Sequence, residues 1–157
     1  MIRLLLKEDD YKLLKEDGWG LLLEMGSPHE AIFGKLSNTR AVTTLCSTRI
    51  YPNYIDYNVK LPAIAYSQIY DPRVHAMGRD PNVGAPRFQV EIFSTSFTQM
   101  RNLSAAAMNA LRDYTGSTWG TIQRIFYEGQ SEAADIDPES RLVTHHATQD
   151  YVVWWNT

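Results

Sequence analysis

Several features that would point to a particular chemistry are missing from this sequence. Cys46 is the only cysteine, so no intrachain disulfide can form, which fits a reducing compartment such as a bacterial cytoplasm. No lysine or arginine stands next to another, and the net charge is −3, so the clustered cations of a nucleic-acid-binding surface are missing. No apolar segment reaches the roughly 20 residues that a membrane-spanning helix needs. We therefore expect a soluble protein that is made and used inside a cell.

Patterns typical of catalytic and metal sites are missing as well. The chain contains no glycine-rich phosphate loop and no nucleophile elbow. His145 and His146 are adjacent in a predicted strand, so their side chains point to opposite faces and cannot bind one ion together. Asp135, Asp137 and Glu139 have the spacing of a calcium loop but lack its glycine and its closing glutamate, which indicates a solvated acidic turn. We predict no catalytic residue, no metal and no cofactor.

The composition that is present is that of an ordinary folded domain. Hydrophobic residues make up 44% of the chain and charged residues 21%, whereas disordered chains combine low hydrophobicity with high net charge. A chain of 157 residues can bury a core without disulfides. We predict an N-terminal arm over residues 1–26 and a single domain over residues 27–157.

The N-terminal arm contains a short internal repeat. Leu5–Asp9 returns as Leu13–Asp17, and Asp17-Gly18 is a tight-turn signal because glycine accepts positive φ without strain. We interpret the arm as a β-hairpin or small meander. A short amphipathic helix, broken at Gly18-Trp19-Gly20, is the alternative.

Capping signals predict three helices in the domain. The first begins at the capping box Ser27–Glu30 and runs to about Ser37. The second spans about residues 39–45. The third begins at the capping box Ser96–Gln99, carries an apolar stripe and ends near Gly116.

Alternation and β-propensity predict four strands. They cover residues 62–70, 87–94, 121–128 and 142–155. In the third strand, Ile122 and Phe126 are expected on one face and Ile125 on the other. The element order predicts an α+β fold, in which an antiparallel four-stranded β-sheet has its helices packed on one face. The segment 71–86, between the first two strands, is a long loop of the kind that is usually functional or disordered.

Five spaced phrases carry a family resemblance. They are Arg49–Pro52, Leu61–Tyr66, Val90–Phe93, Ala105–Leu111 and Gln149–Trp154. In this order and at these separations, they resemble the tail-completion, or tail-terminator, family of long-tailed bacteriophages. The resemblance covers about residues 28–155, so the N-terminal arm has no counterpart in the family pattern.

The resemblance implies a structural protein and not an enzyme. Proteins of this family are expected to form a ring, six-fold in symmetry, that caps the tail tube, ends its polymerisation and joins the tail to the head. The implied partners are further copies of the chain, the major tail-tube protein and a neck or head-completion protein. DNA would pass through the ring without specific binding, and no membrane is involved. The implied location is the top of the tail in the virion, after assembly in the host cytoplasm.

Two alternatives to this function remain open. A neck adaptor or head-completion protein belongs to the same structural class. A small ligand-binding α+β domain or enzyme belongs to a different class, and would need a concave pocket with converging polar groups.

The residues expected to contact a neighbouring subunit or the tube lie in the 71–86 loop and in the N-terminal arm. Arg73, Arg79 and Arg87 carry the guanidinium fork that suits a neighbour's carboxylates; alternatively, they are solvated loop cations of little energetic weight. Trp19 and Trp155 are the aromatic candidates. Trp154 and Trp155 would face opposite sides of the last strand, so one can join the core while the other is exposed; packing of both within the monomer is equally open.

Overall fold

The computed structural model of the protein describes residues 26–118 and 121–156. Their secondary-structure elements, in chain order, are α2 (Pro28–Asn38), α3 (Arg40–Cys46), β1 (Ile50–Pro52), β2 (Ala63–Tyr70), β3 (Val83–Gly84), β4 (Arg87–Ser94), α4 (Phe97–Leu111), β5 (Ile122–Ile136) and β6 (Val143–Asn156). Nearly all of the predicted N-terminal arm, with Trp19, lies outside the described residues, so its conformation stays a prediction. None of the helices in these ranges is long and apolar enough to cross a membrane.

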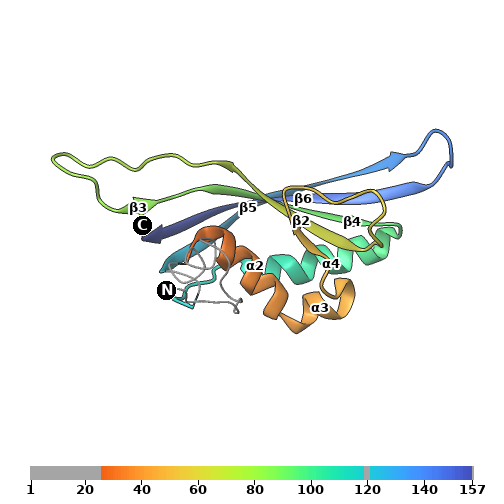
Figure 1. Ribbon diagram of the computed structural model, residues 1–157, viewed down its shortest axis with the longest axis horizontal. Coiled ribbons are helices and arrows are strands. Elements are labelled where there is room, and N and C mark those ends of the chain that lie inside the picture. Colours follow the sequence, from red (N-terminus) through yellow and green to blue (C-terminus); the bar gives the residue numbers. More distant parts are fainter. Residues whose placement is uncertain (1–25, 119–120, 157) are drawn as a thin grey trace, which may run out of the picture.

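The strands form one curled sheet (Figure 1). Strands β2, β4 and β6 lie side by side in this order, and each pair is antiparallel. β5 pairs with the other edge of β6, also antiparallel. The predicted four-strand sheet was therefore incomplete, because the described sheet has six strands. β1 adds to β2 in parallel orientation, and the short β3 forms inside the predicted 71–86 loop and pairs with the end of β6.

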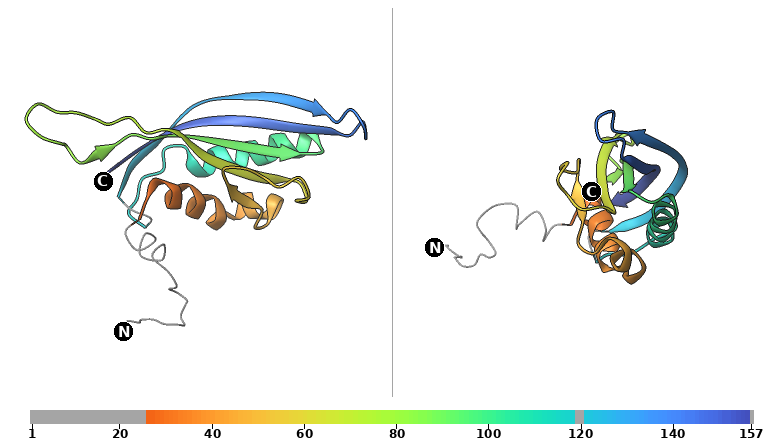
Figure 2. Two further views of the ribbon diagram at one scale, coloured as in Figure 1. Left: turned by 45° about the horizontal axis from the view of Figure 1, so that its top comes forward. Right: turned by 90° about the vertical axis from the view of Figure 1, so that its right-hand side faces the viewer.

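The three helices lie on the same side of the sheet in both views of Figure 2. β4 shows the predicted alternation, because Phe88, Val90 and Ile92 are fully buried beneath the helices while Gln89 and Glu91 are only half-buried on the outer face. The buried side chains of α2, α3 and α4 join the same hydrophobic cluster as those of β4. The α+β architecture is thus confirmed.

The helix starts follow the predicted capping signals. Ser27 Oγ accepts a hydrogen bond from the backbone N–H of Glu30 at 3.2 Å, and Ser96 Oγ accepts one from Gln99 at 3.4 Å. The predicted end of α4 at Gly116 was wrong, since the helix stops at Leu111. Asp113 takes the left-handed conformation there, with φ 63°, and its N–H donates to Ile125 of β5. The chain therefore leaves the helix without needing a glycine.

The side-chain faces predicted for β5 were also wrong. Ile122 and Ile125 are both buried, whereas Phe126 is 44% exposed. A register shift between Ile122 and Arg124 inserts an extra residue into the strand and reverses the alternation after it. β5 also continues to Ile136, so Asp135 of the predicted acidic turn lies in the strand, and Asp137 and Glu139 lie in the β5–β6 turn of residues 137–142.

Candidate functional site

Four of the five phrases that carry the family resemblance lie next to one another in the sheet, and the fifth, Ala105–Leu111, lies on α4. Ile50–Pro52 forms β1 beside the start of β2, and Arg49, just before it, donates a hydrogen bond from Nε to the carbonyl oxygen of Pro62 at 2.8 Å. β4 brings Val90–Phe93 into register with Ala63–Tyr66 on one side and with His146–Gln149 on the other. These phrases therefore define the sheet itself.

Gln149 illustrates this structural role. Its side chain is fully buried. Its Nε2 donates to the Ser104 carbonyl oxygen at 2.9 Å and to Gln130 Oε1 at 2.8 Å, and its Oε1 accepts from the Tyr151 hydroxyl at 2.8 Å. Burial raises the pKa of Tyr151, so its hydroxyl remains a donor throughout the physiological range. The Gln149 amide thus finds all three hydrogen-bond partners within the chain, and these contacts join α4 to β5 and β6.

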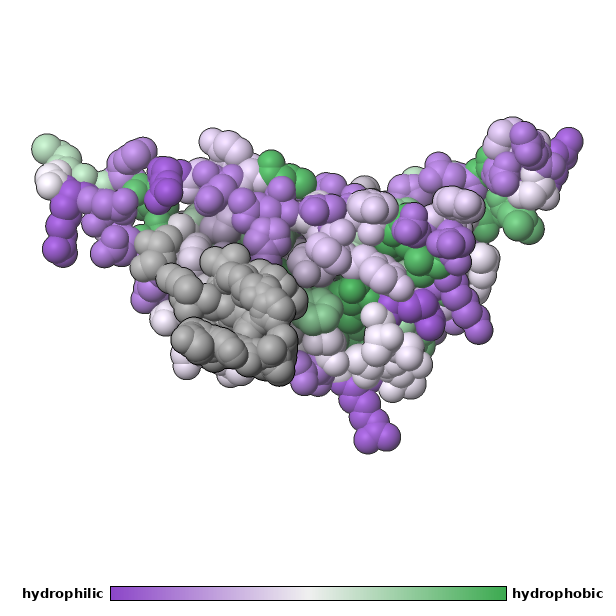
Figure 3. Space-filling model, in the orientation of Figure 1, coloured by the Kyte–Doolittle hydropathy of each residue, from purple (hydrophilic) through white to green (hydrophobic). Residues whose placement is uncertain are grey.

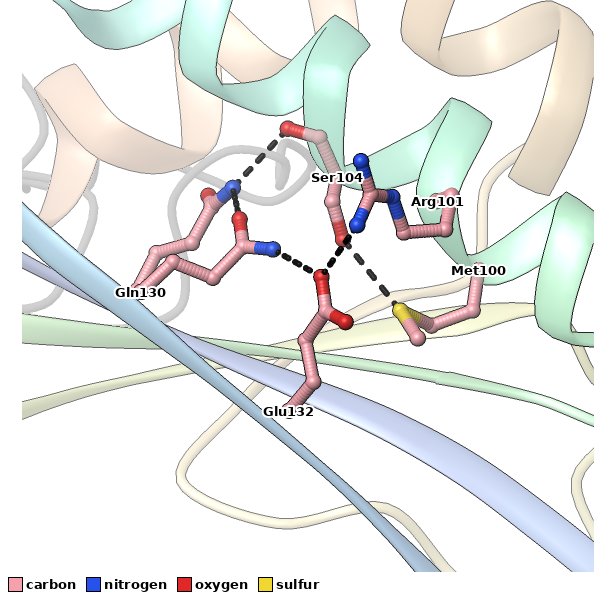
Figure 4. A network of polar contacts seen from close by, with 6 residues as sticks. Met100, Arg101, Ser104, Gln130 and Glu132 are labelled. Carbon is pink, nitrogen blue, oxygen red and sulfur yellow. Dashed lines mark hydrogen bonds and ion pairs between the residues drawn. The ribbon is translucent and has the colours of Figure 1, made fainter.

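The network continues outward from Gln130 to the surface (Figure 4). Gln130 Nε2 donates to Glu132 Oε2 at 2.7 Å, and the same oxygen lies 3.2 Å from the Arg101 guanidinium on α4. On the inner side, the Ser104 hydroxyl donates to the sulfur of Met100 at 3.6 Å. These side chains hold the long β5–β6 hairpin against α4, and we assign them to stability.

The candidate contact surfaces lie at the two ends of the molecule. At one end, residues 71–82 project beyond the body between β2 and β3, and we call this segment the β2–β3 loop (Figure 1). Isolated bridges pair Arg73 with Gly84 and Ala76 with Arg79 across it. Gly78 has φ +98° at the tip, a conformation that glycine adopts without strain. The loop is therefore a folded projection that presents Met77, which is fully exposed.

The predicted contact residues differ in their exposure and in whether they form contacts within the chain. Arg73 and Arg79 are exposed, and neither forms an ion pair with the part of the chain that the structure describes. Arg87 belongs to β4, and its guanidinium lies 2.9 Å from a carboxylate oxygen of Glu128 on β5. Trp155 packs against the hydrophobic core, whereas Trp154 is 36% exposed on the other face. Strand alternation thus separates the two tryptophans as predicted, with Trp155 as the inner one.

The opposite end carries the tip of the β5–β6 hairpin. Exposed apolar side chains gather there, at the right of Figure 3; they are Ile136, Leu142 and Val143. Asp137 organises the turn, because its carboxylate accepts hydrogen bonds from the Ser140 hydroxyl at 2.7 Å and from the Glu139 N–H at 2.9 Å, which lower its pKa. Within the described ranges, no group of three or more His, Cys, Asp or Glu side chains is placed to hold a metal ion.

The histidines of β6 occupy the two faces of the sheet, as predicted. His145 contacts the ring of Phe97 at the start of α4, with centroids 5.7 Å apart. His146 stacks on Phe93 at 5.6 Å, and its Nε2 lies 3.4 Å from Asp135 on β5. Each imidazole packs against a different aromatic ring.

A pocket of about 460 Å³ opens on the outer face of the sheet, beneath the segment that links β1 to β2. Its apolar lining comes from Tyr54, Ile55, Tyr57, Val59, Leu61, Ala65 and Phe93, and its polar lining from Asn53, Asp56, Glu91 and Thr144. Ala65, Phe93 and Thr144 lie at the start of β2, the end of β4 and the start of β6. Strand register therefore places the pocket at the end of the sheet opposite to the β2–β3 loop.

Sequence reasoning missed this pocket. The segment 53–60 follows Pro52 as a connection between predicted elements, and two of its residues, Tyr54 and Tyr57, are large exposed aromatics. Aromatic side chains in a polar connection are a recognisable signal of a binding surface. The polar members, Asp56 and Glu91, are separated in sequence and come together only through the strand order.

Comparisons with known proteins identify the class of this chain. The family model described as tail completion protein gp17 matches residues 30–155. Because this match spans most of the chain, the protein belongs to the tail completion gp17 family, whose members are structural proteins of bacteriophage tails. Among curated proteins, a search finds no match.

A solved chain from the virion of a native gene transfer agent (GTA) particle has a similar fold. The TM-score is 0.59, and the alignment covers 86% of this chain and 98% of that chain. The two sequences are only 11% identical, so the likeness concerns the fold.

Proposed function

We propose that this protein caps the phage tail tube as a closed ring, ends tube polymerisation and joins the tail to the head. The observation that carries the proposal is the family match over residues 30–155. The partners are further copies of the chain, the major tail-tube protein and a neck or head-completion protein. The protein then resides at the top of the tail in the virion. It is incorporated during assembly in the host cytoplasm.

The shape of the subunit supports a ring. Closed rings form through head-to-tail contacts, in which two different patches of the same chain meet. The β2–β3 loop and the β5–β6 hairpin project from opposite ends of the long axis (Figure 1), so each subunit offers two different ends. The proposed ring number is six.

Charge is consistent with a channel for DNA. Each chain has a net charge of −3, so six copies carry −18. A mildly anionic ring repels the duplex and lets it pass without trapping it. The proposed role requires no catalysis and no cofactor.

The test is electron microscopy of lysates from the source phage after deletion of this gene. Filled heads lying apart from tails of uncontrolled length are the expected result, because an uncapped tube keeps growing. Normal, infectious particles would refute the proposal and favour a small ligand-binding domain. Capsids that leak DNA beside tails of normal length would instead identify a neck adaptor or head-completion protein.

A further inference from the structure

We propose that the β2–β3 loop of one subunit docks into the outer-face pocket of the next, with Met77 seated among the pocket's aromatic side chains and Arg79 paired with its carboxylates. The inference rests on the proposed ring and names the two patches that meet in it. The occupant of the pocket is thus a second copy of this chain.

The apolar part of the argument begins with Met77. Its side chain is fully exposed at the tip of a projection, where an unpaired apolar group contributes nothing to the stability of the monomer. Methionine is unbranched and its sulfur makes favourable contacts with aromatic rings. The pocket offers Tyr54, Tyr57 and Phe93. Tyr57 is itself almost fully exposed in the monomer, so its ring has free surface to contribute.

The pocket is large enough for this tip. Its volume of about 460 Å³ falls within the range of about 300–1,000 Å³ that accommodates small ligands. The tip is narrow, because Ala76 bridges to Arg79 across Met77 and Gly78 and because Gly78 has no side chain. The volume therefore accommodates the Met77 side chain, and the narrow tip can bring it to the opening of the pocket.

Charge complementarity selects the same pair of surfaces. Arg79 stands next to the tip, and Asp56 and Glu91 line the pocket. Within residues 26–118 and 121–156, no ion pair is formed by any of these three side chains. Docking would bring the free cation to the two free carboxylates, which fixes the register of the contact and discriminates against other partners.

The positions of the two patches meet the requirement of ring closure. A contact that joins two unlike patches can be repeated from one subunit to the next. The subunits form a closed ring when the rotation between neighbours is a whole fraction of a full turn. The pocket lies where β2 and β6 begin, and the loop lies where β2 and β6 end. Each subunit can therefore hold its neighbour's loop at one end and offer its own loop at the other.

Cysteine cross-linking in phage particles tests the contact. Phage carrying both Met77→Cys and Asp56→Cys would be assembled, purified and oxidised, and the protein separated under denaturing, non-reducing conditions. The expected result is a ladder of covalent multimers, since every subunit contributes one cysteine to each of two contacts. Met77→Cys alone should give no ladder. The native Cys46 is buried, so it should not take part in cross-linking. Met77→Cys combined with Gln123→Cys, which lies outside the pocket, is the matched control and should give no ladder.

Charge reversal and its repair provide a second, independent test. We expect Arg79→Glu to lower the yield of infectious particles at least about tenfold, because it places like charges in each contact. Adding Asp56→Arg should restore much of the yield. Arg40→Glu is the matched control, since Arg40 is an exposed arginine on α3, a helix that contributes no residue to the pocket or to the β2–β3 loop.

The outcomes separate this inference from the proposed function. A capped particle that contains several copies of the protein, but gives no ladder and tolerates Arg79→Glu, would overturn the docking and leave the ring intact. Dimers from Met77→Cys alone would show a contact between like patches and would also overturn it. Normal particles after gene deletion would refute the terminator role itself.

Discussion

Replacing Gln149 by leucine should destabilise the folded chain by an amount that its contacts predict. Leucine keeps the buried volume approximately but removes the amide, so the buried Tyr151 hydroxyl loses its acceptor and Gln130 Oε1 loses its donor, whereas the Ser104 carbonyl, inside α4, keeps its place in the helical hydrogen-bond ladder. A buried polar group left without a partner costs about 1–3 kcal/mol, and each further hydrogen bond that is lost costs about 0.5–1.5 kcal/mol. We therefore expect Gln149→Leu to lower the free energy of unfolding by about 2–5 kcal/mol.

Urea unfolding of the purified chain measures this change. The slope of the unfolding free energy against urea concentration should stay the same, which checks that the folded and unfolded states are otherwise unaltered. Tyr151→Phe leaves only the side-chain oxygen of Gln149 without a hydrogen-bond donor, and should lower the free energy of unfolding by about 1–3 kcal/mol. The double variant should lose less than the sum of the two, because both remove the same hydrogen bond. Gln123→Leu is the matched control, since Gln123 is an exposed glutamine on β5.

A Gln149→Leu chain within about 0.5 kcal/mol of the wild type would refute the reasoning, since that is the range of ordinary surface substitutions. Strict additivity in the double variant would show that Tyr151 and Gln149 do not act through a shared bond.

Two further predictions follow from the fold. Ile125→Ala should lower the free energy of unfolding by about 2–5 kcal/mol and Phe126→Ala by about 1 kcal/mol or less, because the bulge in β5 buries the former and exposes the latter; equal losses would contradict that register. Burial lowers the pKa of His29, so the unfolded chain binds the proton more readily and stability should fall as the pH drops below about 6.5. Melting curves at about pH 7.5 and pH 5.5 should show a smaller drop for His29→Gln than for the wild type, and identical drops would refute a role for this imidazole.

Local rules were sufficient for most of the fold. Ser27 and Ser96 cap their helices because the capping signal needs only neighbouring residues, and the alternation in β4 needs only a sheet with one covered face. The same rules failed where distant segments decide the outcome. β1 is too short to be recognised as a strand, and it forms because Arg49 and its neighbours meet the start of β2. No local sequence pattern predicts the bulge between Ile122 and Arg124, which reverses the side-chain alternation of β5.

The acidic stretch of β5 shows a second kind of failure. Residues 130–136 are exposed and include Glu132 and Asp135, which favours a turn in the sequence, but pairing with β6 continues through all of them. The surfaces were predictable in part. The exposure of Arg73 and Arg79 follows from their place in a long polar loop. The pocket does not follow, because its wall combines the starts of β2 and β6 with the end of β4.

The bulge near the middle of β5 also bears on how this protein stays apart from its own copies before assembly. From Phe126 onward, the outer edge of β5 has no strand partner among the described residues, and a long unpaired edge is a template for sheet-to-sheet aggregation. A register shift between Tyr127 and Gly129 interrupts that edge. This irregularity disfavours the addition of a strand from another copy along β5.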